Sequence, residues 1–414
     1  MFEKLYSSPK AIAWHQNAPY LEEREQYLSH CLDNGYTQES LLLIAKELFW
    51  VASKLSVYPD LRLTLGQVEA VANKWDEREH CCGRSLNVKW TKTRFIQVAR
   101  QWLRFLGYWC EPTDPIPFTH LLDQFSVWME EERGLESSTI QRRKGCLTQF
   151  LCWYGEKKQS FDSIRITDID TYLTVCGTNG CTRVSVKNVA TIIRSFMKYA
   201  GTKGWCDSSI AAAICAPRVY RLENLPAGPS WDQVKTLLAS METDRRCDIR
   251  DLPIIMLCAI YGFRETEVAR LKLENIDWEQ SLIVVERCKR RGGQTYPLVP
   301  VVGSAIIHYL RTVRPQSSFR EVFLTLTPPF RPISRSTIYS LTSRRLAQVG
   351  VNTRHIGPHS LRHACASHLV SENFTLKEIG DHLGHCSSAS TRIYAKVDLQ
   401  GLRQVADFDL GGIL

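Results

Sequence analysis

The sequence lacks any apolar run long enough to cross a lipid bilayer. Its longest, LPIIMLCAIYGF at residues 252–263, is well short of the roughly 20 residues that a membrane-spanning helix needs, and we interpret it as a buried helix. The first residues, MFEKLYSSPKAIAWHQ, also lack the apolar core of a signal peptide. We therefore expect an intracellular, cytoplasmic protein with no membrane contact.

The cysteines show neither a disulfide framework nor the spacing of a metal site. There are 15 of them, an odd number, scattered through the chain, so we expect reduced thiols that pack as small apolar groups. The motifs HExxH and CxxC are absent, and the HCC triplet at residues 80–82 has no second pair at finger spacing. A metal site near the C-terminus is an alternative, built from His359, His363, His368, His382 and Cys386. We favour a protein that uses no metal and no other cofactor.

Positive charge outweighs negative charge by a moderate margin. The chain has 52 Lys and Arg residues against 43 Asp and Glu residues, a formal net charge of +9. This excess is compatible with binding to nucleic acid but does not establish it, because many basic proteins bind nothing acidic. The hydrophobic fraction of 44% and the charged fraction of 23% are typical of a globular protein. A length of 414 residues is enough for two or three domains.

Changes in composition divide the chain into three regions. Residues 1–112 have helical periodicity and end in the proline-rich segment CEPTDPIPF. Residues 115–215 form a second helical region, which is followed by a linker at 216–230 with three prolines and a glycine. Residues 231–414 combine helices with two β-rich runs, SLIVVERC (281–288) and QTYPLVPVV (294–302), on either side of KRRGG. We predict a mainly α, multi-domain α+β protein whose last region holds a small antiparallel β-sheet.

Basic residues recur along two predicted helices of the middle region. The first helix carries them in its first turns, where cations oppose the helix dipole, so either DNA phosphate or a neighbouring acidic face is expected to compensate them. On the second helix they recur every four to seven residues, which indicates either a DNA-contacting face or an ordinary solvated one. The residues are Arg142, Arg143 and Lys144 on the first helix and Arg183, Lys187, Arg194 and Lys198 on the second.

Several residue types suited to phosphate chemistry occur in the last region. Arg264 follows a glycine at the start of a predicted helix, and the hairpin tip carries four cations in five residues. The run HSLRH places His359 and Arg362 three residues apart, on one face of a helix. Further on, the histidine of LGH is followed nine residues later by a tyrosine. The full set is Arg264, Arg287, Lys289, Arg290, Arg291, His359, Arg362, His385 and Tyr394.

These residue types together describe the attack of a tyrosine on a DNA phosphate. A guanidinium matches phosphodiester oxygens and stays charged at physiological pH, and two of them can hold the charge that develops on phosphorus. A tyrosine hydroxyl, with an ordinary pKa of about 10, needs a base or dense positive charge to act as a nucleophile. Histidine can move its proton near neutral pH. Each residue alone also fits a structural role, such as a paired core arginine or a packed aromatic ring.

With these motifs the chain resembles the tyrosine recombinase (integrase) superfamily, which includes the phage integrases and the Xer resolvases. The shared features, in family order, are Arg264 with Glu267, a hairpin lysine, HxLR at 359–362, LGH at 383–385 and TxxY at 391–394. Residues 231–414 look like the family's catalytic domain and residues 115–215 like its core-binding domain. Residues 1–112 lie outside the resemblance.

The resemblance implies a role for each motif residue. Tyr394 would attack the phosphate, form a 3′-phosphotyrosyl link and release a 5′ hydroxyl. Arg264 and Arg362 would hold the phosphate, supported by Glu267, and Lys289 would act as the general acid. Because the link conserves the energy of the phosphodiester, a 5′ hydroxyl from a partner duplex could rejoin the strand without ATP.

The two histidines of the motifs complete this assignment. His359 would help to move the tyrosine proton, and His385 would form a hydrogen bond to the phosphate. Among the hairpin cations we choose Lys289 because it lies eight residues before Pro297, a position similar to that in the family. The other hairpin cations, Arg287, Arg290 and Arg291, are predicted DNA contacts.

The resemblance also implies a place of work and partners. We expect an integrase or transposase of a mobile element, acting on double-stranded DNA at the bacterial nucleoid as a homotetramer. The tail at 395–414 would dock either on a neighbouring protomer or on its own domain. Sister recombinases or accessory DNA-bending proteins are further partners, and residues 1–112 would bind DNA ends, a second recombinase, or both.

Three other functions remain as alternatives. The chain could be a DNA-binding regulator with a residual recombinase fold, although the complete set of catalytic residue types argues against it. It could instead relax supercoiled DNA, as a topoisomerase does, with the same tyrosine chemistry. A telomere resolvase that makes hairpin ends is a variant of that alternative.

Overall fold

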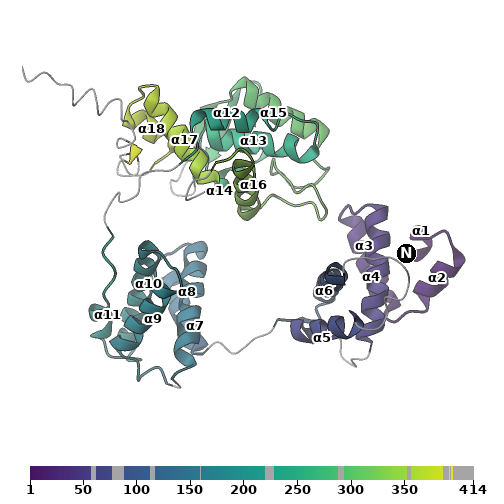
Figure 1. The fold of residues 1–414 in the computed structure, drawn as a ribbon, viewed down its shortest axis with the longest axis horizontal. Helices are drawn as coiled ribbons and strands as arrows, with labels where there is room; N and C mark the ends of the chain where they lie inside the picture. Colours follow the sequence, from purple (N-terminus) through teal and green to yellow (C-terminus); the bar gives the residue numbers. More distant parts are fainter. Residues whose placement is uncertain are drawn as a thin grey trace, which may run out of the picture. The chain divides into compact units, whose positions relative to one another are not determined.

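We describe the fold from a computed structural model of the chain. It describes residues 1–56, 62–76, 88–111, 117–158, 160–219, 228–287, 293–351, 356–385, 391 and 393–394. The chain separates into two compact units, one made of Met1–Trp109 with Asn224–Leu414 and the other of Cys110–Glu223. Figure 1 shows that helices make up most of each unit, which confirms the predicted mainly helical fold.

The N-terminal region contains helices around an apolar core of its own. That core includes Leu48, Val51, Phe95 and Trp102, all fully buried. Helix α4 is amphipathic and begins at Thr37, whose hydroxyl accepts a hydrogen bond from the Ser40 N–H. The elements are α1 (Phe2–Leu5), α2 (Pro9–Gln16), α3 (Leu21–Asp33), α4 (Gln38–Leu55), β1 (Leu63–Thr64), α5 (Leu65–Asp76), α6 (Val88–Phe105) and β2 (Trp109–Cys110).

In the unit Cys110–Glu223, every regular element of the described residues after Cys110 is a helix. Its core is rich in aromatic side chains, among them Phe125, Phe150 and Phe196. The Thr182 hydroxyl caps α10 by accepting a hydrogen bond from the Ser185 N–H. The helices are α7 (Thr119–Glu131), α8 (Ser137–Gly155), α9 (Ile166–Thr178), α10 (Arg183–Thr202) and α11 (Ile210–Ala213).

The C-terminal region combines helices with a three-stranded sheet. The predicted buried helix is confirmed as α13, which packs against α15 and α17. The described part of the linker at 216–230 has no regular structure, and residues 220–227 lie outside the described residues. The elements are α12 (Trp231–Ala239), α13 (Arg246–Ile260), α14 (Glu265–Ala269), η1 (Leu273–Asn275), β3 (Ile276–Asp277), β4 (Leu282–Glu286), β5 (Gly293–Pro297), α15 (Pro300–Thr312), α16 (Arg335–Gln348), α17 (Pro358–Ser371) and α18 (Leu376–Leu383).

The antiparallel pair β4–β5 confirms the predicted small sheet. Leu282 lies opposite Pro297 and Glu286 opposite Gly293, while the short strand β3 pairs with the other edge of β4. The second strand is shorter than predicted, because Pro300 begins α15. A proline fits the first turn of a helix, where its missing N–H costs nothing.

Helix α17 carries the motif residue His359, and the motif residue His385 follows the end of α18. Pro358 begins α17 directly after Gly357. Helix α18 begins at Thr375, whose hydroxyl accepts from the Glu378 N–H, and ends at Gly384 with φ of 62°. Within the described residues, no helix has the length and apolar character needed to cross a bilayer.

Candidate active site

Glu267 is the centre of a group of buried charges at the start of α14. Its side chain is 1% exposed. Its Oε1 accepts a hydrogen bond from Arg264 Nη1 (2.8 Å), and its Oε2 accepts from the Arg264 backbone N–H (2.8 Å) and from Arg287 Nη1 (2.7 Å). The glutamate therefore orients two arginines from different elements at once.

Arg287, at the end of β4, is buried inside the domain rather than exposed at the hairpin tip. Its side chain is 4% exposed. Its Nη2 donates to the Tyr296 hydroxyl, and its Nε donates to Gln294 Oε1 at 3.3 Å. The direct DNA contact of Arg287 stays a prediction, and in this structure its guanidinium contacts Glu267, Gln294 and Tyr296 within the protein.

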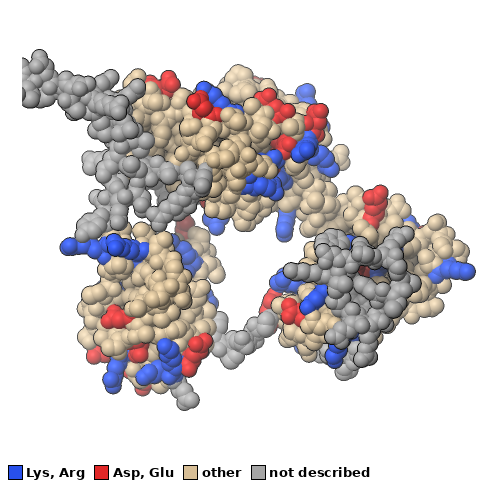
Figure 2. Space-filling model, in the orientation of Figure 1, with Lys and Arg blue, Asp and Glu red and all other residues tan. Residues whose placement is uncertain are grey.

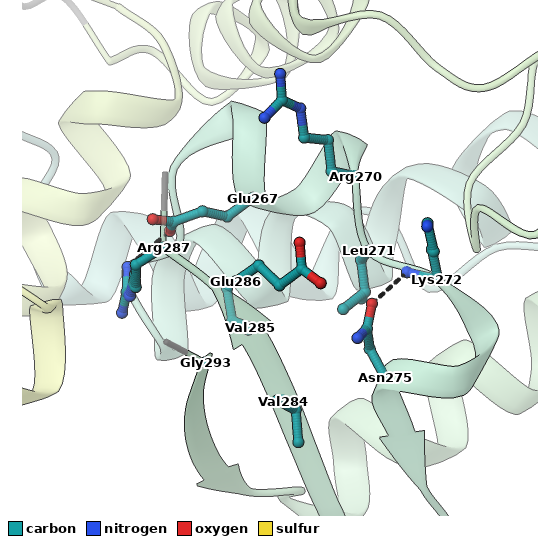
Figure 3. Close-up of a pocket in the computed structure, with 10 residues that line it drawn as sticks. All are labelled: Glu267, Arg270, Leu271, Lys272, Asn275, Val284, Val285, Glu286, Arg287 and Gly293. Carbon is teal, nitrogen blue, oxygen red and sulfur yellow. Dashed lines mark hydrogen bonds and ion pairs between the residues drawn. The ribbon is translucent and has the colours of Figure 1, made fainter. Parts of the chain in front are cut away.

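A cavity of about 340 Å³ lies beside this pair of charges. Figure 3 shows Glu267 pointing toward Arg287 at one end of the cavity, and Glu286 extending into it from β4. Arg270 and Lys272 also line it. The charged group at Glu267 is therefore adjacent to a polar hollow rather than enclosed by apolar packing.

Arg362 lies on α17 and is almost completely buried. Its Nη1 donates to the Gly262 carbonyl, and its Nη2 donates to the Leu383 carbonyl at 2.7 Å. Burial lowers the pKa of Arg362 to about 10, with the charge of Arg264 lowering it further and that of Glu267 opposing. The group remains charged at neutral pH. Arg264, by contrast, has a side chain that is 38% exposed, so it reaches the surface of the site.

Tyr394 is buried next to this positive charge, with 2% of its surface exposed. Its hydroxyl lies 2.8 Å from His363 Nδ1. Burial raises the pKa of Tyr394 to about 12, and the charge of Arg362 opposes this rise. At neutral pH the hydroxyl therefore keeps its proton until a base removes it.

His385 follows the left-handed Gly384 and is held by the segment that carries Tyr394. Its Nδ1 lies 2.8 Å from Thr391 Oγ1, and its ring is parallel to that of Tyr394 at 6.5 Å between centroids. Burial, followed by the positive charges of Arg362 and others, lowers the pKa of His385 to about 4. It is therefore neutral at physiological pH and can donate or accept a hydrogen bond.

The glycine of LGH is required by a close approach. Gly384 adopts a φ of 62°, and a Cβ there would lie 2.6 Å from Arg287 Nε. A larger residue would therefore meet both backbone strain and a clash. The motif glycine thus allows the end of α18 to reach the buried arginine.

Of the other predicted site residues, His359 lies at the surface and the hairpin cations at 289–291 lie outside the described residues. His359 is exposed on α17, with its ring 4.4 Å from that of His363. Lys289, Arg290 and Arg291, as well as the tail at 395–414, lie outside the described residues. His363 was not predicted to take part in the tyrosine chemistry. The signal that could have indicated it is its position four residues after His359, on the same helical face.

The predicted DNA-binding residues of the middle unit fall into two groups. Arg142, Arg183, Lys187 and Lys198 are exposed. The partly buried ones have partners within the protein: Lys144 forms an ion pair with Asp123 at 2.7 Å, Arg143 lies 3.9 Å from Met129 Sδ, and Arg194 donates to the Ile214 carbonyl at 2.6 Å. Figure 2 shows charges of both signs on the visible face of this unit.

The alternative of a metal site finds no support in the described part of the chain. No group of three or more His, Cys, Asp or Glu side chains there is arranged to hold an ion. His382 instead lies with its Nε2 3.3 Å from the Ile260 carbonyl, and His368 stacks on Trp231. Cys386 lies outside the described residues.

The chain is similar in sequence and in fold to known integrases and recombinases. Residues 230–400 match the model of the phage integrase family. The chain is 32% identical over 283 residues to the putative integrase/recombinase y4rA of Sinorhizobium fredii, covering 67% of this chain and 68% of that protein. It is 27% identical to the tyrosine recombinase XerD of Vibrio vulnificus, covering 69% and 93%. The Tn1549 transposon integrase in complex with a circular intermediate DNA has a similar fold, with a TM-score of 0.52, 14% identity and coverage of 68% and 99%.

Proposed function

The chain belongs to the phage integrase family of tyrosine recombinases, enzymes that cleave and rejoin DNA strands, and we propose that it recombines the DNA of a mobile element. Relatives named integrase/recombinase and the likeness in fold to a transposon integrase support this role. The observation that carries it is the buried Tyr394 hydroxyl, placed within the influence of Arg362 in a site with excess positive charge.

Tyr394 is the proposed nucleophile. Its oxygen attacks a DNA phosphorus and forms a 3′-phosphotyrosyl bond, while the bond from phosphorus to the 5′ oxygen breaks. A 5′ hydroxyl from a second duplex reverses the step and rejoins the strands. The energy of the broken phosphodiester is kept in the phosphotyrosyl bond, so the exchange needs neither ATP nor a metal ion.

The remaining motif residues stabilise the phosphate and move protons. Arg264 and Arg362 bind the non-bridging oxygens, where charge develops in the transition state, and Glu267 holds Arg264 in place. His385 donates a hydrogen bond to the phosphate in its neutral form. Lys289 protonates the departing 5′ oxygen.

The proposed substrate is double-stranded DNA carrying two recombination sites, bound by a tetramer. The exposed cations Arg142, Arg183, Lys187 and Lys198 contribute phosphate contacts from the middle unit, as do Arg290 and Arg291 from the hairpin. The tail at 395–414 joins neighbouring protomers. Sister recombinases, accessory DNA-bending proteins and the N-terminal region at 1–112 assist the assembly.

A covalent trapping experiment tests this function. The chain is incubated with nicked duplexes taken from the DNA that flanks its own gene, and protein–DNA adducts that survive detergent are detected. We expect an adduct that disappears on protease treatment and that the Tyr394→Phe variant does not form.

A tyrosine outside the site provides the matched control. Tyr309 is also fully buried, and its hydroxyl accepts a hydrogen bond from the Leu324 N–H at 3.1 Å. Tyr309→Phe should retain the adduct. Binding to several flanking sequences without any adduct would contradict the proposal and favour a DNA-binding regulator.

A further inference from the structure

The hydroxyl of Tyr394 is in contact with a histidine that follows the HxLR motif. His363 Nδ1 lies 2.8 Å from Tyr394 Oη, and the two rings are 5.6 Å apart between centroids. His363 is adjacent to Arg362 in the chain, so the same turn of α17 carries one proposed phosphate ligand and the neighbour of the tyrosine. This distance is that of a direct hydrogen bond.

The neighbouring histidines have other positions. His385 directs its Nδ1 to Thr391 Oγ1 at 2.8 Å. His359 lies one turn before His363 on α17, at the surface, with its ring 4.4 Å from that of His363. His363 therefore lies between the exposed His359 and the buried Tyr394.

We propose that His363 is the base that takes the hydroxyl proton of Tyr394 during strand cleavage. The inference rests on the proposed function and adds a residue to it. As the Tyr394 oxygen bonds to phosphorus, its proton moves to His363 Nδ1. The electron pair of the breaking bond leaves with the 5′ oxygen, which is protonated by Lys289. In rejoining, His363 returns the proton to the departing tyrosine.

Two features of the site favour this assignment over removal of the proton by water. Tyr394 is 2% exposed, so bulk solvent has little access to its hydroxyl. The hydrogen bond also fixes the direction of transfer, because an Nδ1 that accepts it must have its ring proton on Nε2. His359, at the surface end of the histidine pair, is placed to exchange a proton with solvent afterwards.

The test compares variants at His363 in single-turnover formation of the covalent adduct. His363→Ala removes the base, whereas His363→Asn keeps a polar side chain that cannot accept a proton at neutral pH. General-base catalysis is typically worth 10²–10⁴-fold, so we expect both variants to slow adduct formation by about 10²-fold or more. Added imidazole should accelerate the alanine variant. DNA affinity and the thermal unfolding midpoint are measured in parallel, to show that the variants fold and bind.

The matched control lies on the same helix. His368 stacks on Trp231 with 4.1 Å between ring centroids, and His368→Asn should form the adduct at the parental rate. A His363→Ala or His363→Asn variant that also reacts at the parental rate would overturn the inference while leaving the proposed function intact. Failure of the parent protein to form any adduct would overturn both.

Discussion

Two groups of charged side chains lie in the C-terminal region, and they differ in the ratio of arginines to carboxylates. In the first, the balanced cluster, Arg250 and Arg345 meet Asp248 and Asp251. Arg250 donates twice to Asp251 Oδ1, at 2.9 and 2.7 Å, and Arg345 contacts both aspartates. Burial alone would raise the pKa of Asp248, but hydrogen bonds from Thr243 and Arg345 lower it. The cluster satisfies its own charges.

The second group, the arginine-rich cluster, consists of Arg264, Glu267, Arg287 and Arg362. Three arginines and one glutamate carry a net charge of +2, whereas two arginines and two aspartates carry none. Arg264 and Arg287 share Glu267, and the hydrogen bonds of Arg362 within the described residues go to backbone carbonyls. Burying unpaired charge is costly. A fold that needed only stability would balance both clusters, so the excess indicates a place for an anionic ligand, which in the proposed function is the DNA phosphate.

The largest expected effect concerns stability and compares the two clusters directly. Removing one partner of a buried ion pair typically costs about 3–5 kcal/mol. We expect Glu267→Gln and Asp251→Asn each to lower the free energy of unfolding by about that amount. Glu267 is the carboxylate shared by Arg264 and Arg287, and Asp251 is the carboxylate to which the buried Arg250 donates twice.

Chemical denaturation with and without duplex DNA provides the measurement. DNA should restore more stability to Glu267→Gln than to Asp251→Asn, because phosphate replaces the missing negative charge only in the arginine-rich cluster. Equal restoration of the two variants would show that the excess charge does not face the ligand.

The second prediction concerns the rate of cleavage. Arg264→Ala should slow adduct formation by about 10²–10³-fold, the typical cost of losing one donor that stabilises developing charge. Its effect on stability should be small, because the Arg264 side chain is 38% exposed. Arg345→Ala is the control: it should destabilise the protein while the folded fraction cleaves at the parental rate. A comparable slowing in both variants would remove the distinction between the clusters.

The sequence predicted much of this site because its motifs keep a fixed order. Arg264, Arg362, His385 and Tyr394 were identified from their residue types and from motifs that resemble those of the family, and the structure brings them together. Spacing along the chain gives no information about which residues contact one another across 100 positions. Arg362 thus donates to the Gly262 carbonyl, and that contact follows from the packing of α17 on α13 rather than from a motif.

The cations of the hairpin show where sequence reasoning fails. In the sequence, Arg287 and the cations at 289–291 form one basic run with nothing to distinguish them. Arg287 becomes a buried residue only when β4 and β5 pair. The Tyr296 hydroxyl and Glu267 then become its partners. His363 was missed for a related reason. His359 and His363 lie on the same helical face, and only the contact with Tyr394, which is 31 residues further along the chain, shows that His363 is the one beside the tyrosine.

The smallest expected effect uses His385 as a probe of the field around the arginine-rich cluster. Its pKa is lowered to about 4 by burial first and by the charges of Arg362 and Arg264 next. Removing a positive charge favours the protonated ring, so Arg264→Ala should raise this pKa. It should stay below the ordinary value of 6.5, because burial is unchanged. Titration of the His385 ring by NMR measures the shift.

Asp251→Asn is the counterpart in the balanced cluster, and it should leave the His385 pKa unchanged, since Asp251 is not among the charges that act on that ring. The lowered pKa of His385 also has a consequence for stability. Between pH 6.5 and 4 the His385 ring is neutral in the folded state and protonated in the unfolded state, so the folded state binds fewer protons. Stability should therefore fall as pH decreases through that range, and less steeply in Arg264→Ala. A His385 pKa that fails to rise in that variant would mean that the excess positive charge does not extend to the histidine proposed to contact the phosphate.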